Sequence, residues 1–255
     1  MDTSTSFRHR HLPGLSVFFP AYNDANSIAE LVRCADRVAM QVSDEHEIIV
    51  IDDGSRDETP DILNKLAMDI SALKVVHHPL NRGYGAALKS GFNAAGKEWV
   101  FYTDGDGQYD PDELANLIGA LDDSVDVVNG FKVKRRDSLL RGWIGKVYGW
   151  VIRRAFHLPI RDVDCDFRLI RREKVAAVQL TCDSGAICVE LIKKLQLEGS
   201  HFAEVPVHHY PRRYGHSYFF RLGPVWKTRR QLASLYLDLA QYSRRRNDEE
   251  RGFGI

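Results

Sequence analysis

The chain has 255 residues, of which 44% are apolar and 27% charged, and its 35 basic side chains cancel its 35 acidic ones. This composition excludes disordered and collagen-like chains, and the zero net charge argues against wholesale binding to nucleic acid. The longest uncharged run, Leu12 to Asn23, has 12 residues, whereas a membrane-spanning helix needs ~20. Residues 1–13 also lack the apolar core of a secretory signal.

Strand and helix patterns alternate through the first half of the chain. Ser27 and Glu30 have the spacing of a capping box, which predicts a helix that starts there. The other predicted helices are 57–68, 85–95 and 111–121, and the predicted buried strands are 15–19, 47–51, 73–77, 99–103 and 125–131. This alternation predicts an α/β fold with a mainly parallel central sheet flanked by helices. In such sheets, ligands bind beyond the carboxyl ends of the strands.

The second half is less regular, and two amphipathic helices are predicted there. One covers 138–156, and the other follows Pro224, with apolar residues at helical spacing from Leu232 to Leu239. Basic residues lie in or beside both helices, so they can either pack on the domain or lie on an anionic membrane surface. We expect a flexible tail at 1–13, one main domain at 14–217, and an amphipathic helix with a charged tail at 218–255.

The cysteines indicate a reducing compartment. None of the four, Cys34, Cys165, Cys182 and Cys188, forms a CxxC pair. Zinc and redox motifs are therefore disfavoured, and reduced, mostly buried thiols in a cytoplasmic protein are expected.

The segment YTDGDGQYDP carries the strongest chemical signal. Asp104 and Asp106 follow a buried strand two residues apart, and in an extended backbone such residues face the same way, with Gln108 next in the series. Carboxylates so placed suit Mg²⁺ or Mn²⁺ together with phosphate oxygens, although an Asp-Gly turn is the plainer interpretation. The 13 basic and five acidic residues of 132–174 follow this anionic stretch, which fits a metal site beside a phosphate site or two solvated faces.

Two further motifs lie at predicted strand ends or turns. Asp52 and Asp53 end the second strand, where carboxylates can accept hydrogen bonds from a nucleobase or a ribose, while Ser55 or Asp57 can cap the next helix. The glycines from Gly83 onward lack the spacing of a dinucleotide fingerprint but allow the backbone to approach a nucleotide.

Together, the motifs PAYNDANSI, VIDDGSRDET, NRGYGAALKSGF, TDGDGQYDP, DVDCDFRLIRR and RRYGHS resemble, in this order, family 2 glycosyltransferases of GT-A fold. The chain is most similar to polyprenyl- and dolichyl-phosphate sugar synthases, over roughly Leu15 to Ser217. The resemblance implies a Rossmann-like GT-A domain that transfers a sugar from a UDP- or GDP-sugar to a polyprenyl phosphate. It further implies inversion at the sugar, a Mg²⁺ or Mn²⁺ cofactor, and peripheral contact with the cytoplasmic face of a membrane as one option.

The resemblance also implies roles for individual residues. The nucleotide site comprises Pro20, Tyr22, Asn23, Asp24, Asp52, Asp53, Gly83, Asp104 and Gly105. The metal ligands are Asp104, Asp106 and Gln108. The catalytic residues are Asp106, Asp166 and Arg212, and the acceptor-binding candidates are Lys132, Lys134, Arg135, Arg136, Asp162, Arg168 and Ser217.

Some features depart from the family pattern. Asp24 stands where glutamate is commoner, and Asp166 stands where many dolichyl-phosphate mannose synthases have glycine, which weakens a mannose assignment. The long hydrophobic C-terminal extension of many relatives is missing. A sugar hydroxyl as acceptor remains open, with Asp166 or Asp162 as base, as do a nucleotidyltransferase and a non-catalytic binding module. The sequence indicates neither the nucleobase, nor the sugar, nor the oligomeric state.

Overall fold

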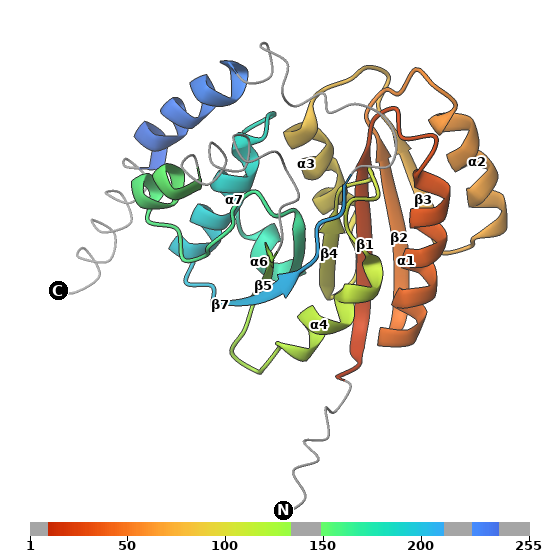
Figure 1. Cartoon of the computed structure of the whole chain (residues 1–255), viewed down its shortest axis with the longest axis horizontal. Coiled ribbons are helices and arrows are strands. Elements are labelled where there is room, and N and C mark those ends of the chain that lie inside the picture. Colours follow the sequence, from red (N-terminus) through yellow and green to blue (C-terminus); the bar gives the residue numbers. More distant parts are fainter. Residues whose placement is uncertain (1–9, 134–148, 212–225, 240–255) are drawn as a thin grey trace, which may run out of the picture.

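The centre of the molecule is a seven-stranded sheet. The structure, a computed structural model, describes residues 10–133, 149–211 and 226–239 (Figure 1). The strands are β1 (Leu12–Ala21), β2 (Ser43–Asp52), β3 (Leu73–His77), β4 (Trp99–Thr103), β5 (Val127–Lys132), β6 (Phe167–Arg171) and β7 (Phe202–Val207). They are arranged in the order β3-β2-β1-β4-β6-β5-β7. Among these seven, β6 alone runs antiparallel to its neighbours, which confirms the predicted mainly parallel sheet.

Helices cover both faces of the sheet. On one face lie α1 (Ile28–Val42), α2 (Thr59–Asp69) and α4 (Leu114–Gly119), and on the other lie α3 (Tyr84–Ala94), α6 (Arg172–Ala176) and α7 (Ala186–Leu197). Strand side chains alternate between the two cores: Val17 and Phe19 belong to the first, and Phe18 between them belongs to the second. Burial on both faces explains why the central strands are continuous apolar runs.

The boundaries of several predicted elements differ from the structure. β1 begins at Leu12, which is buried, so two residues of the expected tail at 1–13 belong to the sheet. The helix expected from 57 begins at Thr59, and the one expected over 111–121 is a 3₁₀ turn (Pro111–Glu113) followed by α4. Ser27 does precede α1, but its side chain forms no capping hydrogen bond, so the capping-box prediction is wrong in its chemistry.

The sequence patterns did not predict β6, α6, α7 or β7. Two of these elements bury a charged residue, Arg168 in β6 and Glu190 in α7, and both side chains are completely inaccessible to solvent. A hydrophobic pattern treats such a residue as exposed, so the apolar period is interrupted where the real element continues.

The two amphipathic segments form helices at 149–156 and 226–239, green and blue at one end of Figure 1. Their inner faces pack on the domain through Ile152, Phe156 and Leu235, among others, and the rings of Phe156 and Tyr236 meet at 5.6 Å. The remainder of the helix predicted over 138–156 and the charged tail lie outside the described residues. Within the described ranges, we find no helix with the length and apolar character needed to span a membrane.

Candidate active site beyond the carboxyl ends of β1, β2 and β4

The loops that follow β1 and β2 hold each other in place. The Asn23 N–H donates to the Ser55 hydroxyl at 3.0 Å, and the Arg56 N–H donates to Asn23 Oδ1 at 2.8 Å. The Asp24 N–H donates to the Thr59 hydroxyl at 3.0 Å. Asn23 has a φ of 58°, a left-handed conformation that asparagine adopts more readily than most residues. The two expected nucleotide motifs therefore form one continuous side of the site.

The loop after β4 docks on the end of β1. The Gly105 N–H donates to the Pro20 carbonyl at 3.3 Å, and the Gly105 carbonyl accepts from the Ser27 hydroxyl at 3.2 Å. A Cβ at position 105 would lie 2.7 Å from the Pro20 carbonyl oxygen, closer than real Cβ contacts come. Glycine is thus required here, and Pro20 and Gly105, both expected at the nucleotide site, are neighbours.

Asp52 ends β2 with its side chain buried, at 2% exposure. Its Oδ1 accepts from the Ser55 N–H at 3.0 Å, and its Oδ2 lies 2.7 Å from His77 Nδ1. A carboxylate offers about four lone-pair positions, and these contacts use two of them. Asp52 therefore keeps acceptor capacity that a ligand N–H or O–H could use.

Asp53 fixes the glycine turn that leads into α3. Its Oδ1 lies 2.6 Å from His78 Nδ1 and accepts from the Arg82 N–H at 2.9 Å, while its Oδ2 accepts from the Gly83 N–H at 2.9 Å. Gly83 has a φ of 98°, and a Cβ there would lie 2.6 Å from the Asp183 carbonyl oxygen. Asp53 and Gly83 thus set the shape of this turn, and the Gly83 N–H is already engaged.

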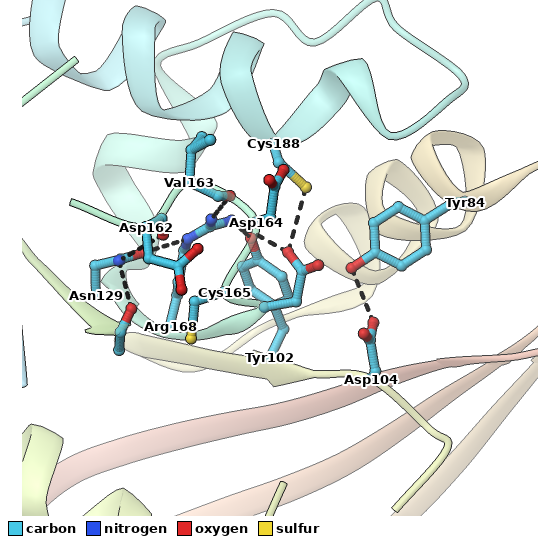
Figure 2. Close-up of polar contacts among 12 residues, drawn as sticks. Tyr84, Tyr102, Asp104, Asn129, Asp162, Val163, Asp164, Cys165, Arg168 and Cys188 are labelled. Atoms are coloured by element: carbon cyan, nitrogen blue, oxygen red, sulfur yellow. Dashed lines mark hydrogen bonds and ion pairs between the residues drawn. The ribbon is translucent and has the colours of Figure 1, made fainter. Parts of the chain in front are cut away.

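Two neighbouring carboxylates act on Asp104 in the loop beyond β4. Burial raises the pKa of Asp104 well above its usual value, and the negative charges of Asp166 and Asp106 raise that pKa further. A hydrogen bond of 3.0 Å from the Tyr84 hydroxyl, shown in Figure 2, and the charge of Lys132 act in the opposite direction. A hard divalent cation would relieve the repulsion between the carboxylates, so this donor set fits Mg²⁺ or Mn²⁺.

The backbone of this loop is a turn rather than the extended strand that the spacing predicted. Gly107 has a φ of 71°, and the Gln108 N–H donates to Asp106 Oδ1 at 3.0 Å. Gln108 is held further by two hydrogen bonds with the backbone of Tyr210, at 2.8 and 3.0 Å. Since its amide nitrogen is the donor in one of them, its amide oxygen can still accept or ligate.

Within the described residues, one trio of potential metal ligands lies within 4.8 Å, and it is Cys34, Asp110 and Asp112. Arg37 lies 3.0 Å from Asp112 and 3.3 Å from Cys34 Sγ, so a cation is already supplied there. The carboxylate oxygens of Asp104, Asp106 and Asp166 do not all lie within that distance of one another. Their side chains would have to move inward to share one ion.

Arg168 is buried beneath this loop, and its guanidinium is held on every side. It donates to the Tyr102 hydroxyl, to the Val163 carbonyl and to Asn129 Oδ1, and it lies 3.4 Å from Asp166 Oδ1 (Figure 2). With no exposed surface, Arg168 cannot reach an acceptor. This corrects its expected acceptor-binding role, and we assign it to holding Asp166 and the preceding loop.

Cys188 of α7 forms a second contact to Asp166, with its thiol sulfur 3.2 Å from Oδ1. Burial raises the pKa of this thiol well above its ordinary value, and the charge of Asp166 raises it further, so the thiol stays a donor. Sequence reasoning missed Cys188 and Tyr84. Tyr84 lies inside the recognised glycine motif and could have been suspected, whereas nothing in the sequence connects Cys188 with Asp166.

Lys132 lies where β5 ends, close to the carboxylates. Its Nζ donates to the Asp164 carbonyl at 2.6 Å and lies 6.0 Å from the centre of the Tyr109 ring. Its N–H donates to Asp162 Oδ2 at 3.4 Å, which brings two acceptor-side candidates together. Five expected site residues lie outside the described residues: Lys134, Arg135, Arg136, Arg212 and Ser217.

Residues 16–178 match the model of glycosyl transferase family 2. The chain belongs to this family.

Curated relatives can be aligned with most of this chain. The undecaprenyl-phosphate 4-deoxy-4-formamido-L-arabinose transferase of Pseudomonas fluorescens is 32% identical over 205 residues, which are 80% of this chain and 59% of the relative. The transferase of the same name from Salmonella choleraesuis is 30% identical over 205 residues, again 80% of this chain, and 62% of the relative. The chain thus spans about three fifths of the length of these relatives.

Solved structures share the fold. Glucosyl-3-phosphoglycerate synthase from Mycobacterium tuberculosis, in a complex with Mn²⁺, UDP and glucosyl-3-phosphoglycerate, has a TM-score of 0.66 at 20% identity. The match covers 89% of this chain and 79% of that one. The mannosyltransferase PcManGT from Pyrobaculum calidifontis, in a complex with GDP-Man and Mn²⁺, has a TM-score of 0.62 at 23% identity, over 91% and 65% of the two chains.

Proposed function

We propose that this chain transfers a sugar from a UDP- or GDP-sugar to a polyprenyl phosphate, with inversion at the sugar and with Mg²⁺ or Mn²⁺. The observation that carries the proposal is the group of Asp104, Asp106 and Asp166 beyond β4, with Lys132 close by. Relatives at 30–32% identity that are named as undecaprenyl-phosphate sugar transferases support the acceptor class.

The donor site lies between the two interlocked loops and the acidic loop. Pro20, Tyr22, Asn23 and Asp24 supply one side, and Asp52 supplies a buried acceptor for the nucleobase or ribose. Asp104, Asp106 and Gln108 would hold the cation. The cation, when bound, neutralises the charge that the departing nucleoside diphosphate gathers.

The acceptor phosphate approaches from the side of β5 and the segment 162–168. A phosphate is already ionised near neutral pH, so it needs cations rather than a base to attack the anomeric carbon. Lys132 supplies one positive charge there, and we propose that Lys134, Arg135 and Arg136 act beside it and Arg212 at the diphosphate. One displacement breaks the bond to the diphosphate as the bond to the acceptor oxygen forms, and the anomeric configuration inverts.

The test is a transfer assay with UDP- and GDP-sugars, Mn²⁺ and a polyprenyl phosphate in detergent. Asp104→Asn and Asp106→Asn should each abolish transfer, because each removes a charge that the cation needs. Asp61→Asn, the same substitution on the exposed side of α2, is the matched control and should leave the rate unchanged. Wild-type turnover by either loop variant would overturn the metal site, and a product with retained configuration would overturn the single displacement.

A sugar hydroxyl as acceptor is the second candidate function, and the position of Asp166 favours it. Asp166 interacts with Asp104 and is oriented by two donors, Arg168 and Cys188, as a general base would be. With a hydroxyl acceptor, Asp166→Asn should slow transfer by about 10²–10⁴-fold, since the base is lost. A small loss would argue against a base and therefore for the phosphate acceptor.

We also propose that the enzyme works in the cytoplasm, at the surface of a membrane. A polyprenyl chain is held in a bilayer by the hydrophobic effect, because each buried methylene contributes ~0.8 kcal/mol. Nucleotide sugars are water-soluble, so the two substrates meet at the interface. This part of the proposal would fail if water-soluble saccharides were glycosylated as fast as the lipid phosphate.

A further inference from the structure

The helix at 149–156 leaves an amphipathic surface uncovered. Its inner side is buried, whereas Trp150 is 59% exposed and Val151 is 46% exposed. Residues three and four positions apart share a helix face, so Arg153 and Arg154 flank Trp150 on the outer side. Neither guanidinium has a hydrogen bond or ion pair with any residue in the described ranges.

The helix at 226–239 repeats this pattern. Trp226 is 67% exposed and Leu237 is 64% exposed, while Leu232, Leu235 and Leu239 are buried. Three basic side chains are exposed on the same helix, Lys227, Arg229 and Arg230, against the single acidic residue Asp238.

The two helices lie beside each other at one end of the molecule (Figure 1), joined by the contact between Phe156 and Tyr236. We call the exposed side chains of this end the tryptophan–arginine face; it comprises Trp150, Val151, Arg153, Arg154, Trp226, Arg229, Arg230 and Leu237. Counting every exposed charge on both helices gives five basic residues and one acidic residue.

A cationic hollow of about 410 Å³ adjoins this face, at the carboxyl end of the helix 149–156. Arg153, Arg154 and Arg161 line it together with His157 and apolar side chains, and none of the described residues that line it is acidic. Arg161 is fixed by Glu204, at 3.2 Å, and by the Phe131 ring, at 4.7 Å. The helix end contributes roughly half a negative charge, which three arginines outweigh even when Glu204 offsets one of them.

We propose that the tryptophan–arginine face docks on an anionic bilayer and that the cationic hollow receives the phosphate of a lipid headgroup. Tryptophan settles at the level of lipid headgroups, and arginines near an anionic surface are attracted to it. Burial of this face against a second copy would bring two sets of cations together. Binding along a nucleic acid would leave the exposed Trp226 and Leu237 without apolar partners.

This inference deepens the proposed function and rests on it, since the acceptor lipid would be reached from the docked face. It concerns residues outside the metal and nucleotide sites. The two can therefore be tested separately.

The test is flotation of the full chain with vesicles of phosphatidylcholine alone or of phosphatidylcholine mixed equally with phosphatidylglycerol. We expect binding to the anionic vesicles only, and binding that weakens as salt is added. The double variant R153Q/R154Q should bind about 25-fold more weakly, since each basic residue near the surface contributes a factor of about five. Trp226→Ser should also weaken binding.

Matched controls lie on the opposite side of the molecule. R33Q/K65Q removes two exposed basic residues of α1 and α2, and Met68→Ser removes an exposed apolar side chain of α2. Both should bind vesicles as the wild type does. Equal binding by R153Q/R154Q and the wild type, equal loss in R33Q/K65Q, or no binding to anionic vesicles would each overturn the proposal.

A second measurement separates the docking proposal from the proposed function. Transfer to a short-chain, water-soluble polyprenyl phosphate should be unchanged in R153Q/R154Q, while transfer to the long-chain lipid in vesicles should fall. If vesicle binding behaves as expected but no polyprenyl phosphate is glycosylated, the acceptor assignment fails and the docking surface stands. If soluble transfer occurs without vesicle binding, the docking proposal alone fails.

Discussion

Two side chains hold Asp166 in place. One is the fully buried Arg168, and the other is Cys188 of α7, which lies much further along the chain. Arg168 approaches one of its oxygens at 3.4 Å, and the Cys188 thiol approaches the same oxygen at 3.2 Å. The family resemblance implied an acceptor-binding role for Arg168, although a buried, paired arginine is an uncommon finding that sequence alone does not predict. In the structure its guanidinium contacts four partners, Asn129, Tyr102, Val163 and Asp166, and the Asp166 carboxylate gains a defined direction.

Cys188 offers a test of this orientation that preserves the size of the side chain. Cys188→Ser retains a donor to Asp166, whereas Cys188→Ala removes it. With a hydroxyl acceptor, for which Asp166 is the base, we expect the alanine variant to lose about 10–100-fold in kcat, with little change in KM for the nucleotide sugar. The serine variant should recover most of kcat.

Stability measurements on the same two variants provide the control. If kcat falls equally in both variants, or falls only in proportion to the folded fraction, Cys188 is a packing residue and does not position Asp166.

At the scale of elements, α3 packs unusually close to β1. A Cβ at Gly91 would lie 2.4 Å from the Phe18 ring. That ring is enclosed by Tyr102, stacked at 5.3 Å, and by Phe92, edge-on at 5.0 Å, so it has little room to move. The approach of this helix to the sheet also sets the position of Tyr84, which donates to Asp104.

Gly91→Ala should therefore destabilise the protein, although alanine favours a helix by about 1 kcal/mol. Overpacking costs about 1–3 kcal/mol, so after the helix gain we expect a net loss of up to about 2 kcal/mol in the free energy of unfolding. Gly119→Ala in α4 is the matched control, because no atom lies within 4 Å of the added Cβ. It should gain about 0.4–1 kcal/mol, and a gain at Gly91 of similar size would contradict the close packing.

α7 is tied to the loop before it by a buried carboxylate. Burial alone would raise the pKa of Glu190, but hydrogen bonds from Lys194, Cys182 and Thr181 lower that pKa below its usual value. The Lys194 Nζ lies at 2.7 Å and the Cys182 N–H at 2.8 Å. Burial raises the pKa of the neighbouring Cys182 thiol to about 12, so this thiol stays neutral at acidic and neutral pH.

This gives a pH dependence with a definite sign. A carboxyl whose folded pKa is below its unfolded value of ~4.3 stabilises the fold above that pH, and the stabilisation is lost as the pH falls through the folded pKa. Glu190→Gln should cost about 1–3 kcal/mol at neutral pH, because buried donors lose an acceptor, and should flatten the fall in stability below pH ~4.3. Urea unfolding at several pH values measures the free energy of unfolding and its dependence on pH. If that pH dependence is the same in the variant and the wild type, Glu190 does not cause the loss of stability in acid.

The strands β1 to β5 could be predicted because each is an apolar run and each helix between them carries an apolar side. The elements after β5 could not, for reasons visible in particular residues. β6 contains the buried Arg168, and its antiparallel place between β4 and β5 is set by tertiary pairing rather than by local sequence. Glu190 interrupts the apolar pattern of α7 in the same way.

On the scale of the whole molecule, the candidate site is assembled from segments that are far apart in the sequence. The loops after β1, β2 and β4 could be expected to meet, because carboxyl ends of parallel strands share one edge of the sheet. The contacts Asn23 to Ser55 and Gly105 to Pro20 bear this out. Contacts made through β6 and α7 depend on how those elements dock, so Arg168 and Cys188 could not be placed in advance.

A site assembled from so many segments should stabilise the whole fold when its ligands bind. A ligand at 100 times its dissociation constant adds about 2.7 kcal/mol, and each kcal/mol shifts Tm by about 2–4 °C in a chain near this size. With Mn²⁺, the matching UDP- or GDP-sugar should therefore raise Tm by about 5–10 °C. The donor without Mn²⁺ should raise it less, since the diphosphate then faces uncompensated carboxylates. Asp104→Asn should remove the part of the Tm rise that depends on Mn²⁺. The remaining rise should persist, because the proposed donor contacts of the residues from Pro20 to Asp52 are unchanged. If the shift in Tm is equal with and without Mn²⁺, or if Asp104→Asn leaves it unchanged, the acidic loop does not bind the cation. Either result would contradict the proposed mechanism.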